Sequence, residues 1–250
     1  MKVEVSYITN IGKVRYRNED AILAATKVFS EISMEQPIYE TLNVEGTVPF
    51  AVADGMGGHP CGDRASGLVL EVLRGGSPET EEDLKELLLT AKEVMDRHVE
   101  ANPDCFGMGT AVAGVFLSSS RAIVFNVGDC RVYRMRESLE RLTKDHSVVQ
   151  ELFERGLIGE EEMRFHPERN ILTSSVMGGY PEEPKVFSRT EEVLPGDLYL
   201  ICSDGLWEEV SREFMEGCMQ KGVREGGIRL FEGAYADGRD NISFILFRVL

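Results

Sequence analysis

The sequence contains little cysteine and no long apolar run. Its five cysteines are odd in number and widely spaced, and no CxxC pair occurs among them. They are Cys61, Cys105, Cys130, Cys202 and Cys218. This pattern is typical of reduced structural cysteines, so we predict neither a disulfide nor a cysteine zinc site.

Segments that would direct the chain to a membrane are also missing. Apolar stretches such as residues 198–202 are far too short to cross a bilayer. The start, MKVEVSYITN, alternates like a strand and lacks the apolar core of a signal peptide. We therefore expect a cytoplasmic protein that does not bind a membrane.

Positive charge is in short supply. The chain has 27 lysine and arginine residues against 43 aspartate and glutamate residues, which gives a net charge of −16. Nucleic acids and anionic membranes repel such a chain, so we exclude both as main partners. If the substrate is an anion, something other than the protein as a whole must supply positive charge at the site.

The common signatures of catalytic nucleophiles and nucleotide-binding loops are absent. The sequence has no GxSxG, no GxxxxGKS/T, no GxGxxG within a strand–helix–strand unit and no HCx5R segment. Its four histidines form no HExxH pair, which disfavours zinc. A water molecule activated by a bound metal ion remains as the candidate nucleophile.

Length and patterning predict one α+β domain over residues 1–250. Strands are expected over 3–9, 21–29, 48–53, 110–117, 122–126, 130–136, 197–202 and 242–250, with 21–29 as the hairpin partner of 3–9. Helices are expected over 62–73, 81–102, 147–155, 211–220 and 225–236, and a loop over 30–47. Because few strand–helix–strand spacings occur, we expect mostly antiparallel sheet with helices outside it.

Acidic residues recur where the predicted strands end, beside glycine or asparagine. These clusters are Asn18-Glu19-Asp20, Asp54-Gly55, Gly128-Asp129, Ser203-Asp204-Gly205 and Asp240-Asn241. One such cluster alone is typical of a turn, but strand ends of one sheet lie close together, so these carboxylates can converge. Converging carboxylates repel one another and need cations. Oxygen ligands suit Mg²⁺ or Mn²⁺ rather than zinc.

Seven motifs together resemble the metal-dependent Ser/Thr protein phosphatases of the type 2C class, in their compact bacterial form. They are GKVRYRNED, ADGMGGH, GMGTAVAGV, NVGDCRVY, KDHS, SDGLW and RDNIS, in the family's order between residues 12 and 243. The resemblance implies a four-layer α-β-β-α sandwich, with two central, mostly antiparallel sheets between helices. It also implies two Mn²⁺ or Mg²⁺ ions, with a third in bacterial members.

The resemblance assigns metal-binding roles to the acidic clusters. It implies that Asp54 bridges two metal ions, one of which also binds the Gly55 carbonyl, while Asp204 and Asp240 hold the other. Glu19 and Asp20 match positions that bind metal-bound water or a metal edge. Asp129 matches a position tied to the third ion.

Further residues match the substrate side of the site. Arg15 matches the arginine that binds the substrate phosphate, and residues 147–175 match a mobile flap. His59 is a candidate general acid, but eukaryotic relatives typically place a histidine where this chain has Met56; a metal-bound water is the alternative proton donor. Two other positions depart from the pattern: Cys130 replaces a common serine, and the flap lacks an arginine found in many bacterial relatives near Ser174.

The implied reaction is hydrolysis of phosphoserine and phosphothreonine in proteins by a water that bridges two divalent cations. The implied partners are a Ser/Thr kinase and its substrates, and we expect a monomer. Two alternatives stay open. The chain could be an inactive family member that serves as a regulatory binding module, although its metal-binding aspartates are complete. It could also hydrolyse another phosphoester.

Overall fold

The computed structural model describes residues 1–163 and 165–250 and forms two antiparallel β-sheets. One sheet has the order β4-β1-β13-β12-β8-β9, and the other has the order β11-β7-β6-β5-β2-β3, with β10 added beside β6. The strands of the first sheet are β1 (Lys2–Asn10), β4 (Ile38–Asn43), β8 (Arg131–Met135), β9 (Leu139–Arg141), β12 (Leu198–Cys202) and β13 (Ile242–Val249). Those of the second are β2 (Asp20–Ala24), β3 (Lys27–Phe29), β5 (Val48–Gly55), β6 (Gly109–Leu117), β7 (Arg121–Val127), β10 (Val176–Met177) and β11 (Phe187–Glu192).

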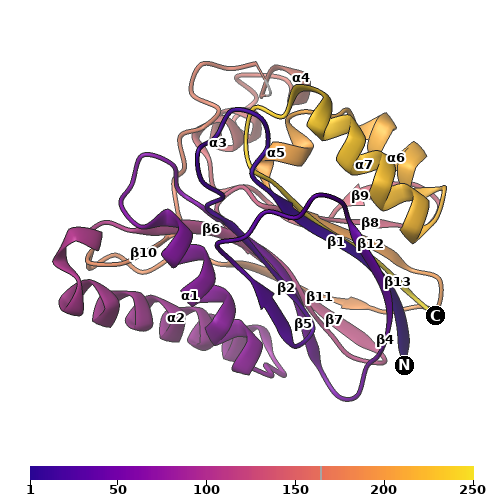
Figure 1. Ribbon diagram of the computed structural model, residues 1–250, viewed down its shortest axis with the longest axis horizontal. Helices are drawn as coiled ribbons and strands as arrows, with labels where there is room; N and C mark the ends of the chain where they lie inside the picture. The colour runs from indigo at the N-terminus through magenta and orange to yellow at the C-terminus, as the bar shows by residue number, and fades with distance from the viewer. Residues whose placement is uncertain (164) are drawn as a thin grey trace.

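Helices cover the outer face of each sheet, as Figure 1 shows. The second sheet is covered by α1 (Gly62–Gly75) and α2 (Glu81–Ala101), and the first by α6 (Arg212–Met219) and α7 (Val223–Asp237). Shorter helices are η1 (Pro103–Cys105), α3 (Val148–Glu154), α4 (Glu160–Met163) and α5 (Asp204–Trp207). The predicted four-layer sandwich is therefore confirmed. Among the described residues, no helix has the length and apolarity needed to span a bilayer.

Strand alternation sends side chains of one strand into two separate cores. In β5, Phe50 and Val52 belong to the core between the sheets, whereas Ala51 and Ala53 pack beneath α1 and α2. This follows from the two-residue period of a strand, whose successive side chains point to opposite faces. The same period directs the next even-numbered residue of β5, Asp54, toward the space between the sheets.

Two expectations about the amino-terminal third are wrong. The predicted loop 30–47 contains β4, an edge strand that pairs with β1 and is largely exposed, so its sequence carries little apolar signal. The predicted strand 21–29 is instead a hairpin of β2 and β3, and β2 pairs with β5 rather than with β1. Strand β1 pairs with β13, which lies more than two hundred residues later in the chain. Short-range pattern could not reveal that partner.

The expectation that all cysteines are reduced is also wrong. Cys61 and Cys105 form a disulfide with a Cα–Cα distance of 5.5 Å, while Cys130, Cys202 and Cys218 are free and buried. Cys61 caps the start of α1 and Cys105 lies in η1. These two elements meet because β5 and β6, whose ends they adjoin, pair in register. The sequence separation of 44 gives no hint of that contact.

We predict that reduction of the Cys61–Cys105 disulfide lowers the free energy of unfolding by about 2–4 kcal/mol, because the cross-link restricts a long loop of the unfolded chain. Urea unfolding with and without dithiothreitol measures this difference. The double variant Cys61→Ser/Cys105→Ser is the control and should show no response to dithiothreitol. Equal stability of the native chain in both conditions would contradict the prediction.

Candidate active site

The acidic clusters meet at one end of the sandwich, in a cavity of about 160 Å³. Its lining includes five carboxylates, which are Glu19, Asp54, Asp129, Asp204 and Asp240. Arg15, the Gly55–Gly57 backbone, and Asn170 and Leu172 of the predicted flap complete most of the wall. Residues that lie far apart in the sequence therefore share one small polar space, as strand-end convergence predicted.

The second sheet supplies two of the acids from neighbouring strands. Asp20 begins β2 and Asp54 lies near the end of β5, and the two are register partners in the sheet. Alternation places both on the face that meets the first sheet. Gly55 follows Asp54, and a Cβ there would lie 2.3 Å from the Gly62 carbonyl oxygen and 2.6 Å from that of Glu19. Glycine at this position is therefore required by backbone contacts around the site.

The first sheet supplies the opposing acids. Asp204 starts α5 two residues after the end of β12, and Asp240 lies two residues before the start of β13. Asn241 fixes the chain beside them: its side-chain amide donates to the carbonyls of Ile11 and Arg17 at 3.0 Å each, and its Oδ1 accepts from the Glu19 amide at 2.9 Å. One asparagine thus joins the loop after β1 to the start of β13.

A buried polar layer lies beneath the acids. The Ser203 hydroxyl donates to Asp20 Oδ2 at 2.8 Å, and the Ser243 hydroxyl donates to Thr9 Oγ1 at 2.9 Å. Asn18 also donates to Thr9 Oγ1, at 2.7 Å. This layer separates the apolar core between the sheets from the charged cavity, and it orients Asp20, which is 1% exposed.

Crowding and burial make ionisation of these acids costly. Burial raises the pKa of Asp54 well above its usual value, and the nearby Asp20 and Asp204 carboxylates raise it further. Burial likewise raises the pKa of Asp204, and among the neighbouring charges Asp129 raises this pKa most. Burial raises the pKa of Asp20 to about 7. Burial and neighbouring negative charge both favour the protonated form, and a bound cation would favour the ionised one.

The donor set fits hard divalent cations. Within residues 1–163 and 165–250, the buried Asp20 Oδ1 has no hydrogen-bond partner, and the ligands at hand are carboxylate and carbonyl oxygens, which suit Mg²⁺ or Mn²⁺. Among the described residues, no group of three or more His, Cys, Asp or Glu side chains is arranged so that it could hold a metal ion. Mg²⁺ typically binds through one or two carboxylates and keeps several waters, so an incomplete protein shell is compatible with it.

The predicted phosphate-binding arginine lies at the mouth of the cavity. Arg15 Nη2 donates to Asp240 Oδ2 at 2.6 Å, and its side chain remains 44% exposed. A guanidinium held here places positive charge beside the acids, where an anionic substrate would otherwise be repelled. Arg17, two residues later, is 78% exposed and lies 4.0 Å from Asp63, and it does not line the cavity.

His59 is placed differently from the acids. Its Nδ1 contacts the Gly107 carbonyl oxygen at 2.9 Å, and the ring is not part of the cavity lining. Met56, by contrast, lines the cavity, and its backbone amide donates to the Gly109 carbonyl at 3.0 Å. With Nδ1 engaged, the atom from which His59 could donate a proton is Nε2.

The predicted flap meets the site through its base. Asn170 and Leu172 line the cavity, and an isolated β-bridge joins Leu172 to Ser147. Arg164, within the predicted flap, lies outside the described residues. Sequence reasoning did not assign a role to Asn170, Ser203 or Asn241. Asn241 and Ser203 adjoin acidic clusters, which is the signal that could have identified them, whereas Asn170 carries no such signal.

The chain is similar in sequence to known phosphatases. A family model described as protein phosphatase 2C matches residues 26–166. The serine/threonine protein phosphatase PstP of Mycobacterium tuberculosis is 33% identical over 247 residues, covering 96% of this chain and 43% of PstP. The serine/threonine phosphatase stp of Listeria monocytogenes is 31% identical over 262 residues, covering 98% of this chain and 95% of stp. The chain thus spans less than half the length of PstP.

Solved structures share the fold. The crystal structure of PstP/Ppp from Mycobacterium tuberculosis has a TM-score of 0.83 at 30% identity and covers 100% of this chain and 99% of that chain. The crystal structure of the PstP catalytic domain in complex with two manganese ions has a TM-score of 0.78 at 30% identity and covers 100% of both chains. The similarity therefore extends over the whole sandwich.

We predict that the metal-free protein becomes less stable as pH rises from about 4 to about 7. The Asp20 carboxyl has a pKa of about 7 when folded and an ordinary value of 3.8. In this window the folded chain binds more protons than the unfolded chain, so the free energy of unfolding falls with rising pH, by at most about 1.4 kcal/mol per pH unit for each such group.

Urea unfolding in excess EDTA, at several pH values across this window, measures the effect. Asp20→Asn should flatten the dependence, because it removes one raised carboxyl. Added Mg²⁺ should stabilise the protein most at the upper end of the window. A free energy of unfolding that rises steadily with pH in EDTA would show that the acids are not crowded as described.

Proposed function

Because this chain belongs to the protein phosphatase 2C family, we propose that it hydrolyses phosphoserine and phosphothreonine in proteins with the help of divalent cations. The observation that carries the proposal is the convergence of Asp54, Asp204 and Asp240 on one cavity beside Arg15. This arrangement combines a cation-binding set of oxygens with a guanidinium suited to phosphate.

The residues divide into metal ligands and a phosphate ligand. Asp54 would be the ligand shared by two cations. The Gly55 carbonyl would bind one of them, and Asp204 and Asp240 would bind the other. Glu19 and Asp20 would hold water or a metal edge, and Asp129, whose charge acts on Asp204, would serve a third ion.

Two Mn²⁺ or Mg²⁺ ions bound there would supply a shared water of lowered pKa as nucleophile and would neutralise charge on the phosphoryl oxygens. The protein's part is to hold the carboxylates in a fixed array and to bind the phosphate through Arg15. A guanidinium can donate two parallel hydrogen bonds to phosphate, which also orients the group. This guanidinium donates a hydrogen bond to Asp240 in the structure.

The proton for the leaving alkoxide has two proposed sources. His59 is the candidate side chain; its Nδ1 contacts the Gly107 carbonyl oxygen, so its Nε2 would be the donor atom. The ring does not line the cavity, and the disulfide at Cys61 anchors one end of the loop that carries it. Water held by the acidic cluster is the alternative donor.

The two rival functions have less support. A non-catalytic binding module would have no need for the full set of carboxylates, which carry the electrostatic cost described above. Hydrolysis of another phosphoester would use the same cavity, which is small and would contact little of the substrate beyond its phosphate. The similarity to phosphatases named for serine and threonine favours phosphoprotein substrates.

Several further assignments remain predictions. These are a cytoplasmic location, a monomeric state, a single domain over residues 1–250, a flap over 147–175, and a Ser/Thr kinase with its substrates as partners. The kinase partner is expected because phosphoserine and phosphothreonine must be made by such an enzyme. The net charge of −16 supports the expectation that nucleic acid is not a partner.

We predict that the chain releases phosphate from a phosphothreonine peptide only when Mn²⁺ or Mg²⁺ is added, because sites made mainly of carboxylates and water are readily stripped by chelators. Phosphate release in Mn²⁺, in Mg²⁺ and after exhaustive EDTA treatment provides the measurement. Undiminished turnover in EDTA would exclude the metal-dependent reaction. Phosphate release from small phosphoesters but not from peptides would favour the alternative substrate class.

We predict different defects for Asp204→Asn and Arg15→Ala. Asp204→Asn keeps the side-chain shape and removes a metal-binding charge, so turnover should fall by orders of magnitude and Mn²⁺ binding should weaken. Arg15→Ala removes a charge-assisted hydrogen bond to phosphate, worth about 1.5–3 kcal/mol, which corresponds to an about ten- to two-hundredfold loss in kcat/KM. Part of that loss should appear in KM, because phosphate is charged before the reaction as well.

Steady-state kinetics and calorimetric Mn²⁺ titration distinguish the two defects. Arg17→Ala is the matched control, since this exposed arginine of the same loop does not line the cavity, and it should behave like the native chain. Arg15→Ala should not weaken Mn²⁺ binding. If the two variants exchanged their phenotypes, the metal and phosphate assignments would both be wrong.

A further inference from the structure

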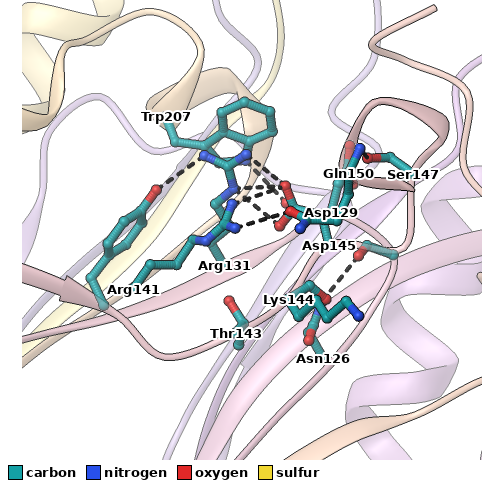
Figure 2. Close-up of polar contacts among 12 residues, drawn as sticks. Asn126, Asp129, Arg131, Arg141, Thr143, Lys144, Asp145, Ser147, Gln150 and Trp207 are labelled. Atoms are coloured by element: carbon teal, nitrogen blue, oxygen red, sulfur yellow. Dashed lines mark hydrogen bonds and ion pairs between the residues drawn. The ribbon is translucent and has the colours of Figure 1, made fainter. Parts of the chain in front are cut away.

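A buried polar network behind the carboxylates has no part in the proposed reaction. At its centre, the guanidinium of Arg131 lies against the indole of Trp207 and is paired with Asp145, as Figure 2 shows. Trp207 is the last residue of α5, the helix that begins with Asp204. Asp129 stands two residues before Arg131 in the turn between β7 and β8. The network therefore connects two acids of the cavity with the segment that leads into the proposed flap.

Trp207 holds the backbone at Asp129. Its Nε1 donates to the Asp129 carbonyl oxygen at 3.1 Å, and its ring centroid lies 3.4 Å from the Arg131 guanidinium carbon. An indole N–H is a donor only, and a cation–π contact is strongest when it is desolvated. The ring is fixed on one side by Arg131 and on its edge by Asp129. Because Trp207 and Asp204 share one helical turn, this contact links the turn of Asp129 to the helix of Asp204.

Arg131 and Asp145 form the rigid part of the network. Arg131 Nε donates to both carboxylate oxygens at 3.1 and 3.0 Å, and its Nη2 donates to Oδ2 at 2.6 Å. The two side chains are 12% and 1% exposed. A planar guanidinium in such a fork allows one orientation, which a lysine could not reproduce. The pair fixes the direction in which the chain leaves the Asp129 turn.

The base of the proposed flap is bonded to the same turn. The His146 amide donates to the Gly128 carbonyl at 2.8 Å, and the Gly128 amide donates to His146 Nδ1 at 3.1 Å. On the other side of the flap base, the Thr173 amide donates to the His146 carbonyl at 2.8 Å. Both ends of the flap are therefore attached to the turn that carries Asp129.

We propose that Trp207 and Arg131 are positioning residues that hold Asp129 opposite Asp204 and transmit cation binding at this edge to the base of the flap. A cation that draws the two carboxylates together acts on Trp207 through α5 and on His146 through the turn. Linkage is reciprocal, so a flap base held in one position also favours the cation. This role rests on the proposed function, because it serves the same metal-binding edge.

The first test uses the native chain, in which Trp207 is the only tryptophan. The probe is Mn²⁺ alone, added without substrate to the 250-residue chain after the chain has been stripped with chelator. Trp207 emission should change on titration, and Asp129→Asn should shift the change to higher Mn²⁺ concentration. Emission that stays constant while calorimetry reports Mn²⁺ binding would overturn the proposal.

The second test removes one hydrogen bond. Trp207→Phe keeps an aromatic ring against Arg131 but deletes the N–H that binds the Asp129 carbonyl. Calorimetry should show an about two- to tenfold weaker Mn²⁺ site, the effect expected for one lost hydrogen bond. In the native chain Mn²⁺ should slow hydrogen exchange of the Val148 and Thr173 amides, which bind the Ile171 and His146 carbonyls. In Trp207→Phe this slowing should be largely lost.

A matched control separates positioning from general destabilisation. Tyr7 lies on β1 outside the cavity lining, and Tyr7→Phe removes its side-chain hydrogen bond of 2.8 Å to Glu40. This variant should retain the native Mn²⁺ affinity and the native slowing of hydrogen exchange. A folded Trp207→Phe variant with the native Mn²⁺ isotherm and the native exchange response would contradict the proposal. If that variant does not fold, the Mn²⁺ titrations of Trp207 emission in the native chain and in Asp129→Asn still test the proposal. Because no substrate is used, a chain without phosphatase activity would contradict the proposed function and leave these results interpretable.

Discussion

The site depends on holding several carboxylates together in a space enclosed by two β-sheets. Asp20 and Asp54 come from one sheet, and Asp204 and Asp240 from the ends of strands in the other. Like charges brought together out of water oppose folding, which is why burial and proximity raise the pKa of Asp54 and Asp204. The array therefore persists only because the surrounding sandwich is stable enough to impose it, and a bound cation would turn this repulsion into attraction.

The sandwich imposes the array through strand parity and a polar layer. Phe50 and Val52 anchor β5 in the core between the sheets, so the next residue of the same parity, Asp54, must face the same space. The Ser203 hydroxyl donates a hydrogen bond to Asp20, and this polar contact lies between the apolar core and the charged cavity. Asn241 adds the third constraint, because it joins the loop after β1 to the start of β13. Each acid is placed by an element whose position is fixed elsewhere in the fold.

Much of this arrangement could be predicted from the sequence, because its signals are local. Acidic residues beside glycine at the ends of apolar strands identified Asp54, Asp129 and Asp204, and the motifs in order identified the layered fold. Contacts between distant segments gave no such signal. The Cys61–Cys105 disulfide and the pairing of β1 with β13 depend on how whole strands dock. The placement of His59 away from the cavity likewise depends on its contact with Gly107, which no local pattern encodes.

The choice of a buried ion pair behind the site is informative about what the site requires. A buried pair such as Arg131–Asp145 adds little stability over apolar packing of similar volume, because both charges must be desolvated. The pair instead fixes the orientation of the side chains. A guanidinium bound by a carboxylate and stacked on Trp207 has one orientation, whereas an apolar cluster would allow several. A set of repelling carboxylates tends to spread apart, so it needs surroundings that resist displacement. The rigid pair is placed where the turn of Asp129, the helix of Asp204 and the base of the proposed flap meet, which is where such displacement would begin.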